Sequence, residues 1–253
     1  MGDKMEQVVE VRGLVNRFGK AVIHNGLDID LMRGEVLGVV GASGTGKSVL
    51  LRSIVGLQRP NAGSVKVFGV DVLTADLTAI RARYGVMFQD GALFSALTVR
   101  ENVEAPMRVQ VSLSPELRRS LADLKLAMVG LPPKAGDLYP SDLSGGMRKR
   151  AGIARALALD PEILLLDEPT AGLDPISATE FDELIGALRQ SLNLSVFLVT
   201  HDIDTLHATC DRIAVLAAGK VLVTGTMAQM RDVADPWVNS YFNGPRGHAA
   251  SAG

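Results

Sequence analysis

A glycine-rich run placed between an apolar segment and a helical pattern constrains the fold of this 253-residue chain more than any other feature. Residues 36–40 are apolar and typical of a buried strand, and residues 49–55 carry apolar side chains at helical spacing. Between them lies the sequence Gly41-Ala42-Ser43-Gly44-Thr45-Gly46-Lys47-Ser48. The order of strand, loop and helix predicts that backbone N–H groups and the helix dipole attract a polyphosphate at these residues.

Two side chains of this loop have specific predicted roles. Lys47 is expected to reach the β- and γ-phosphates as a point charge, and the Ser48 hydroxyl to ligate Mg²⁺. A chance glycine turn is the competing interpretation, which the flanking strand and helix disfavour. Phosphate binding alone leaves kinases, GTPases and helicases open.

A second apolar run, residues 163–166, ends in two adjacent carboxylates, Asp167 and Glu168. Neighbours on a strand point in opposite directions, so one acid can hold the metal while the other orients the attacking water as a general base. We assign Asp167 to the metal and Glu168 to the water. The alternative is a simple turn into Pro169, and the phosphate loop upstream decides against it.

Composition limits the class of protein. An apolar content of 47% suits one substantial core and a smaller inserted lobe, and a net charge of −2 disfavours a nucleic-acid partner. The single Cys210 cannot form an intrachain disulfide, and neither a leader nor an apolar run of membrane-spanning length is visible. These features predict a cytosolic protein that associates with a membrane only peripherally.

Strand and helix patterns alternate along the chain, as in a parallel sheet covered by helices. An antiparallel pair is predicted at residues 8–14 and 26–31, with further strands at 84–88, 163–167, 196–200, 213–216 and 221–223. Helices are expected to start near Pro175 and Ile203. Residues 90–140 are expected to form a helical lobe. Its helices are expected to be divided at Pro106, Pro115, Pro132 and Pro133.

The run Leu143-Ser144-Gly145-Gly146-Met147 and the later Thr200-His201-Asp202 complete a set of motifs. With them the chain resembles the nucleotide-binding subunit of an ATP-binding cassette (ABC) transporter. The resemblance implies an α/β fold, a P-loop NTPase (RecA-like) core with an antiparallel β subdomain and an inserted α-helical subdomain. It places the ABC domain at residues 8–244, with core segments 8–89 and 143–225, a helical lobe at about 90–142, a C-terminal helical extension at 226–244 and a disordered tail at 245–253.

The resemblance also implies residue roles. ATP is bound by a head-to-tail homodimer in which Ser144, Gly145 and Gly146 of one subunit cover the γ-phosphate held by the other. Phe18 is expected to stack on adenine, Gln89 to lie near Mg²⁺ and water, Asp174 to contribute to the dimer, and His201 to sense the γ-phosphate. Taken alone, Phe18 suits a core residue and His201 a loop histidine. Met147 stands where most members of the family carry Gln or Glu, and Phe18 stands where Tyr is commoner. Neither change removes a phosphate donor or the base.

The segment 89–94 and the Leu-Ser-Gly-Gly-Met run are similar to the branch that serves MCE-type lipid transport, including the maintenance of lipid asymmetry (Mla) ATPases. This similarity implies ATP hydrolysis that energises phospholipid-type transport, peripheral attachment at the cytoplasmic face of the inner membrane, an integral MlaE-like permease, an MCE substrate-binding protein and possible control by a STAS-domain regulator. Ala92, Leu93, Phe94 and Leu97 are either a socket for the permease or the lobe's own core. The alternative functions are an importer of amino acids or osmolytes and, less favoured, a soluble non-transport ABC ATPase.

Three further patterns give structural expectations. The helix after Pro115 carries Leu117, Leu121, Leu124 and Met128, expected to fill the core of the lobe. Arg148, Lys149, Arg150 and Arg155 are expected to form mostly a solvated helical face. Trp237 and Tyr241, one helical turn apart near the C-terminus, are expected to pack on their own domain, a sister subunit or a regulator.

Overall fold

The computed structural model of the chain describes residues 6–74 and 77–244. The predicted tail at 245–253 lies outside the described residues. The chain divides into two compact units, one formed by residues 1–80 and 195–253 and the other by residues 81–194. Each unit is described by itself below.

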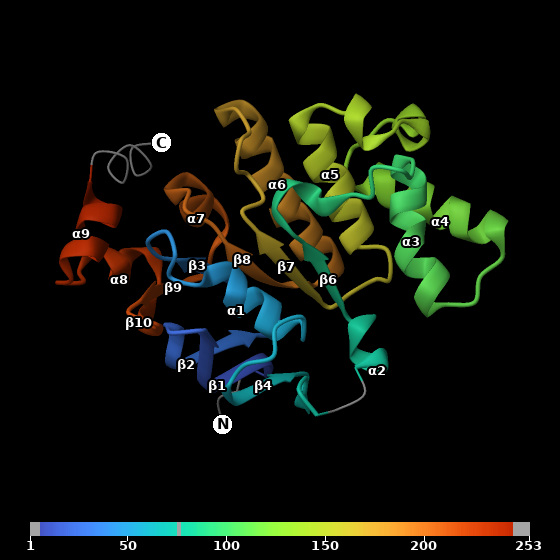
Figure 1. The fold of residues 1–253 in the computed structure, drawn as a ribbon. Helices are drawn as coiled ribbons and strands as arrows, with labels where there is room; N and C mark the ends of the chain where they lie inside the picture. Colours follow the sequence, from blue (N-terminus) through green and yellow to red (C-terminus); the bar gives the residue numbers. More distant parts are fainter. Residues whose placement is uncertain (1–5, 75–76, 245–253) are drawn as a thin grey trace, which may run out of the picture. The chain divides into compact units, whose positions relative to one another are not determined.

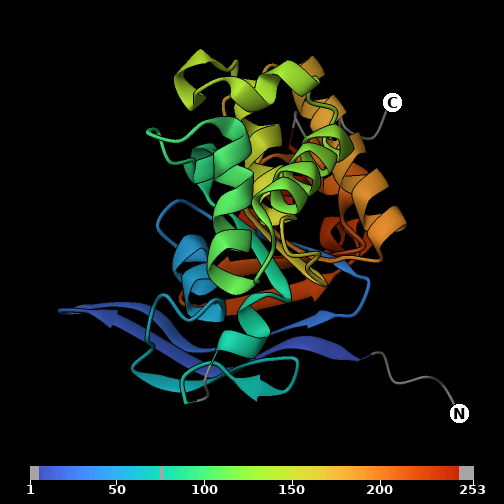
Figure 2. The ribbon, with the colours of Figure 1, turned by 90° about the vertical axis from the view of Figure 1, so that its right-hand side faces the viewer.

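The first unit contains an antiparallel sheet with strand order β2-β1-β4-β5. Strands β1 (Gln7–Phe18) and β2 (Ala21–Met32) pair along their length, which confirms the predicted antiparallel pair and extends it (Figure 2). The sequence analysis missed β4 (Ala62–Val67) and β5 (Val70–Asp71). Their apolar side chains are few and follow Gly63 and Ser64, so no alternating pattern of useful length marks them.

The same unit holds the strand that leads into the phosphate loop, β3 (Val36–Val40). It lies parallel between β8 (Ser195–Val199) and β9 (Arg212–Ala217), and β10 (Lys220–Gly225) adds to β9 in antiparallel orientation. All residues of β3 and β8 are buried, as expected for strands covered on both faces. The predicted strands are therefore confirmed in this unit.

The helices of this unit connect and cover these strands (Figure 1). The helix α1 follows the phosphate loop, α7 follows β8, and α8 and α9 follow β10. The predicted start at Ile203 is confirmed. The bounds are α1 (Lys47–Ile54), α2 (Thr78–Arg81, at the unit boundary), α7 (Ile203–Thr209), α8 (Met227–Arg231) and α9 (Pro236–Asn243).

The second unit contains two parallel strands, β6 (Tyr84–Met87) and β7 (Ile163–Asp167), and the four helices α3 to α6. The predicted helical lobe falls within this unit, and the predicted helix start at Pro175 is confirmed. The helices are α3 (Val99–Gln110), α4 (Pro115–Met128), α5 (Gly145–Ala156) and α6 (Pro175–Leu192), with short 3₁₀ turns η1 (Gln89–Ala92), η2 (Pro133–Asp137) and η3 (Pro140–Asp142).

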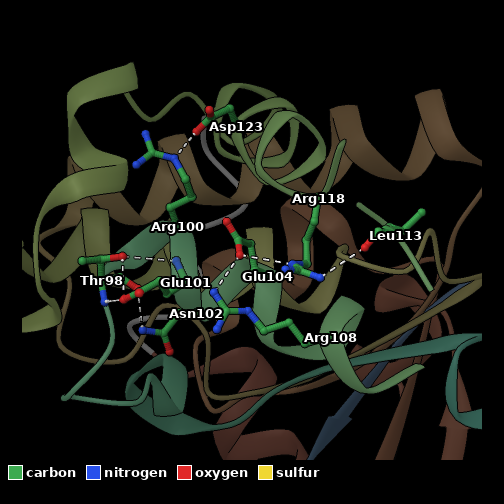
Figure 3. Close-up of polar contacts among 9 residues, drawn as sticks. All are labelled: Thr98, Arg100, Glu101, Asn102, Glu104, Arg108, Leu113, Arg118 and Asp123. Carbon is green, nitrogen blue, oxygen red and sulfur yellow. Dashed lines mark hydrogen bonds and ion pairs between the residues drawn. The ribbon is translucent and has the colours of Figure 1, made fainter. Parts of the chain in front are cut away.

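Polar contacts fasten α3 within this lobe (Figure 3). Thr98 and Glu101 form a capping box at the start of α3. Glu104, almost buried, accepts hydrogen bonds from Arg108 at 2.8 Å and Arg118 at 3.4 Å, while Arg100 Nε bonds Asp123 at 2.6 Å. Because the Glu104–Arg118 and Arg100–Asp123 pairs join α3 to α4, the lobe is held by charge as well as by apolar packing.

Two expectations about this lobe were wrong. Pro106 lies inside α3 and does not end it, because Val103 and Met107 on either side are buried and hold the helix in place. On α4, Leu117 and Leu124 are 49% and 53% exposed and do not fill the core. The buried residues of α4 are Ala122, Lys125 and Leu126. Lys125 interrupts the apolar pattern of the buried face of α4. The apolar periodicity of the sequence therefore pointed to a different face, the one that carries Leu117 and Leu124.

Candidate nucleotide site

The phosphate loop, residues 41–46, joins β3 to α1 in the first unit. Gly46 adopts φ +94° at the N-cap of α1, and Ala42, Ser43 and Gly44 are exposed. Lys47 Nζ donates to the carbonyls of Gly41 at 2.8 Å and Ala42 at 3.3 Å, which keeps the ammonium group at the loop. The arrangement is that of an anion site at a helix N-terminus.

Close packing behind the loop explains one of its glycines. A Cβ added to Gly46 would lie 2.4 Å from Ile23 Cγ2 and 2.6 Å from His24 Nε2, both on β2. His24 is fully buried, and Asn16 Nδ2 lies 3.0 Å from His24 Nδ1 and donates to Ser53 Oγ at 3.1 Å. This polar cluster joins β1, β2 and α1 directly behind the phosphate loop, and the sequence analysis did not identify it.

Two more predicted residues of the first unit, Phe18 and His201, are exposed. Phe18, at the end of β1, is 47% exposed, which rules out the core alternative and leaves its ring available for stacking. His201 follows β8 and precedes α7, whose N-cap Asp202 accepts a hydrogen bond from Asp204 N at 3.0 Å. The side chain of His201 is therefore presented from a loop anchored at both ends.

The carboxylates Asp167 and Glu168 belong to the second unit. Asp167 ends β7 and is 5% exposed, whereas Glu168 has already left the strand and adopts a left-handed φ of +51°. The expectation that both lie on one strand was therefore wrong. The turn after Asp167 sets the direction of the Glu168 side chain, and a non-glycine residue in this conformation is uncommon.

The basic residues of α5 are not a solvated face, contrary to expectation. Lys149 is 4% exposed, and its Nζ donates to the carbonyl of Glu168 at 3.2 Å. Arg148, Arg150 and Arg155 also donate to main-chain carbonyls of neighbouring loops, those of Leu143, Val129 and Ala92 among them. Long cationic side chains here satisfy the carbonyls of irregular segments that a periodicity argument cannot see.

The helix α5 begins at the glycine pair predicted to bind a phosphate. Ser144 is its exposed N-cap, and its Oγ accepts from Met147 N at 3.3 Å. A Cβ on Gly146 would meet no atom within 4 Å, and one on Gly145 would make only an ordinary contact with Leu173 at 3.7 Å. The chain itself therefore does not require glycine here, which favours a requirement from a ligand or partner.

Asp174 and Gln89 lie on the surface of the second unit. Asp174 caps α6, accepting from Ile176 N at 3.1 Å and Ser177 N at 3.0 Å, and the hydrogen bonds from Ser177 lower the pKa of Asp174. Gln89 is exposed at the start of η1. Both are placed where a ligand or second subunit can reach them.

An apolar groove of about 540 Å³ follows Gln89 in this unit. Its lining includes Phe88, Ala92, Phe94, Pro106 and Val109. Phe94 is 57% exposed, and the Arg155 guanidinium lies 5.9 Å from its ring centre. Phe94 thus does not pack into the core of its own lobe, which favours the socket alternative.

No helix within residues 6–74 and 77–244 is long and apolar enough to cross a membrane.

Comparisons with known proteins agree with this arrangement. The family model for ABC transporters matches residues 24–171. The chain is 37% identical to the probable ribonucleotide transport ATP-binding protein mkl of Mycobacterium leprae, over 96% of this chain and 70% of that protein. It is 44% identical to the methionine import ATP-binding protein MetN of Caulobacter vibrioides, over 81% of this chain and 62% of that protein.

Two solved structures share the fold. One is an ATP-binding cassette in a dimeric, post-hydrolysis state with ADP and Pi, with a TM-score of 0.79 and 32% identity over 86% of this chain and 98% of that one. The other is cbiO1 of Clostridium perfringens, part of the transporter complex cbiONQ, with a TM-score of 0.80 and 28% identity over 97% and 99%. The chain belongs to the ABC transporter family, as its ATP-binding subunit. Its ABC ATPase fold has the expected antiparallel β subdomain and helical insert.

Proposed function

We propose that this ABC ATPase energises the transport of phospholipid-type molecules across the bacterial cell envelope, together with an integral permease and an MCE substrate-binding protein. The observation that carries the transport role is the apolar groove after Gln89, where the exposed ring of Phe94 offers a seat for a cytoplasmic helix of the permease. The subunit then works from the cytoplasmic face of the inner membrane. A STAS-domain regulator is a further candidate partner.

The proposed chemistry assigns one task to each residue. Phe18 stacks on adenine, the main chain of residues 41–46 and Lys47 bind the phosphates, and Glu168 takes a proton from the attacking water. His201 contacts the γ-phosphate. Ser48, Asp167 and Gln89 supply hydroxyl, carboxylate and amide oxygens, the donors that Mg²⁺ prefers, and the ion would neutralise charge developing on the phosphates.

A second copy of the chain completes the proposed site. The exposed N-terminus of α5, with Ser144 and two glycines that the chain does not itself require, suits the γ-phosphate of ATP held by the partner subunit. Asp174 contributes to the contact between the two subunits. ATP binding then closes the dimer, hydrolysis opens it, and the permease converts closure into alternating access.

The substitution Glu168→Gln tests the catalytic part. We expect ATP binding to remain, turnover to fall by about 10³-fold or more, and the ATP-bound dimer to accumulate. Glu183→Gln, an exposed glutamate on α6, is the matched control and should retain turnover. Normal turnover in Glu168→Gln would remove Glu168 from the mechanism.

The cargo needs its own experiment. Lipid is favoured by the similarity of residues 89–94 and 143–147 to the lipid-transport branch, whereas the 44% identity to a protein named for methionine import favours a small-solute importer. The assembled complex should be purified from native membranes and its bound molecules identified by mass spectrometry. Phospholipid in stoichiometric amount supports the proposal. A complex free of lipid whose ATPase activity is stimulated by an amino acid supports the importer.

A further inference from the structure

The C-terminal helix α9 is built into the core of the first unit and is not a loose appendage. Val238 and Phe242 are 0% and 1% exposed, and they belong to one buried cluster with Ile203 and Leu206 of α7. The N-cap Asp235 accepts from Trp237 N at 2.9 Å and Val238 N at 3.1 Å, which fixes where the helix begins. The helix therefore has a defined position beside the segment that carries His201.

The outward face of α9 makes a direct polar contact with that segment. Tyr241 Oη donates a hydrogen bond of 2.8 Å to the main-chain carbonyl of His201. The Tyr241 ring stacks on Trp237 with centroids 5.0 Å apart and planes at 11°, and it meets Phe242 edge-on at 4.9 Å. Two neighbouring rings thus limit the rotation of Tyr241, so its hydroxyl is held where the carbonyl lies.

The His201 loop is open on the side that faces α9. A cavity of about 590 Å³ is lined by His201, Asp202, Ile203, Trp237 and Tyr241. Asp202 is held through its own N–H, which donates to Thr200 Oγ1 at 3.1 Å, and through its cap on α7. The carbonyl of His201 projects from the opposite side of the same peptide, and Tyr241 fixes it there. Because side-chain packing does not close the cavity, this hydrogen bond restrains the peptide that follows His201.

We propose that Tyr241 is a positioning residue for His201, through which α9 controls ATP turnover. The inference rests on the proposed contact between His201 and the γ-phosphate. Holding the carbonyl of His201 restrains the peptide that follows its Cα, and so the backbone from which the imidazole projects. Misplacement of a group that acts on the reacting phosphate lowers the rate of the chemical step more than the affinity for ATP.

The test compares Tyr241→Phe with Asn243→Ala in the full-length protein. Tyr241→Phe keeps the ring and its stacking and removes only the hydroxyl. Asn243→Ala removes a matched bond from α9 to main chain, since Asn243 Nδ2 donates to the carbonyl of Arg231 at 2.9 Å, away from His201. We expect kcat for ATP to fall about 2- to 10-fold in Tyr241→Phe, from the usual worth of one hydrogen bond, with KM changed less than about twofold.

Thermal unfolding and a third variant separate the possible causes. If the role of Tyr241 is only structural, both variants will show the same kcat as the parent protein at temperatures below unfolding, and the inference is overturned. His201→Ala should lose most turnover. Normal turnover in His201→Ala would overturn the proposed role of His201 itself, whereas normal turnover in Tyr241→Phe alone overturns only the positioning by α9.

Discussion

Lys149 Nζ, almost completely buried in α5, donates a hydrogen bond of 3.2 Å to the main-chain carbonyl of Glu168. Glu168 has a left-handed backbone just after β7, where nothing in the strand itself directs its side chain. The helix α5, capped by Ser144, is thereby tied to the proposed general base within one unit. A displacement of α5 by a partner or nucleotide would act directly on the backbone of Glu168.

Lys149→Met should lower kcat for ATP by about tenfold with little change in KM, because a charged donor to the Glu168 carbonyl is lost while the volume and burial of the side chain are kept. Steady-state ATPase assays measure both constants. Lys134→Met, an exposed lysine in η2, is the control and should behave as the parent protein. Unchanged kcat in Lys149→Met would show that the turn holds Glu168 without help.

Gly46→Ala should weaken both folding and ATP binding, because the new Cβ would lie 2.4 Å from Ile23 and 2.6 Å from His24. Gly13→Ala is the matched control, since Gly13 also has a positive φ but a Cβ there meets nothing within 4 Å. We expect the free energy of unfolding in urea to fall by about 1–3 kcal/mol more in Gly46→Ala than in Gly13→Ala. Equal losses would mean that backbone strain alone explains the glycine.

The stability of the first unit should decrease in mild acid because of His24. Burial lowers the pKa of His24, against a smaller opposing contribution from the main chain of Gly46. The unfolded chain therefore binds a proton more readily, and the contribution of His24 is complete above the unfolded pKa of about 6.5 and is lost as the pH falls through the lower folded value. Each unit of separation corresponds to about 1.4 kcal/mol.

His24→Gln tests this pH dependence, because the amide can still pair with Asn16 but does not titrate. The free energy of unfolding, measured from about pH 7 to about pH 5, should vary less with pH in His24→Gln than in the parent protein. His207→Gln, at an exposed position on α7, should leave the slope unchanged. A parent protein equally stable across this range would contradict the prediction.

Phe94→Asp should impair assembly with the permease while leaving the ATPase activity of the separate subunit within about twofold of the parent value. A charge in the apolar groove opposes the docking of an apolar helix. The loss of one central aromatic residue should weaken binding by about tenfold or more. Recovery of the subunit with detergent-solubilised permease measures this. Leu57→Asp, at a position 68% exposed outside the groove, should assemble normally.

The sequence analysis predicted most of what is local or periodic. The strand at 36–40, the phosphate loop and the helix after it follow from apolar runs and glycine spacing, which the backbone follows wherever packing agrees with them. Periodicity failed where polar groups are buried. Lys125 and Lys149 lie inside the second unit because carboxylate or carbonyl oxygens lie within their reach, and no pattern in the sequence marks such partners.

The amino-acid sequence by itself determined the family, the candidate phosphate-binding loop and the identity of the candidate catalytic groups, because each depends on residue types at fixed short spacings. Only the tertiary structure decided that Glu168 leaves its strand, that Lys149 holds it, and that Tyr241 reaches the loop of His201, 40 residues away along the chain. These contacts join segments distant in sequence, and they form because core packing, as at Val238 and Phe242, fixes where each segment lies.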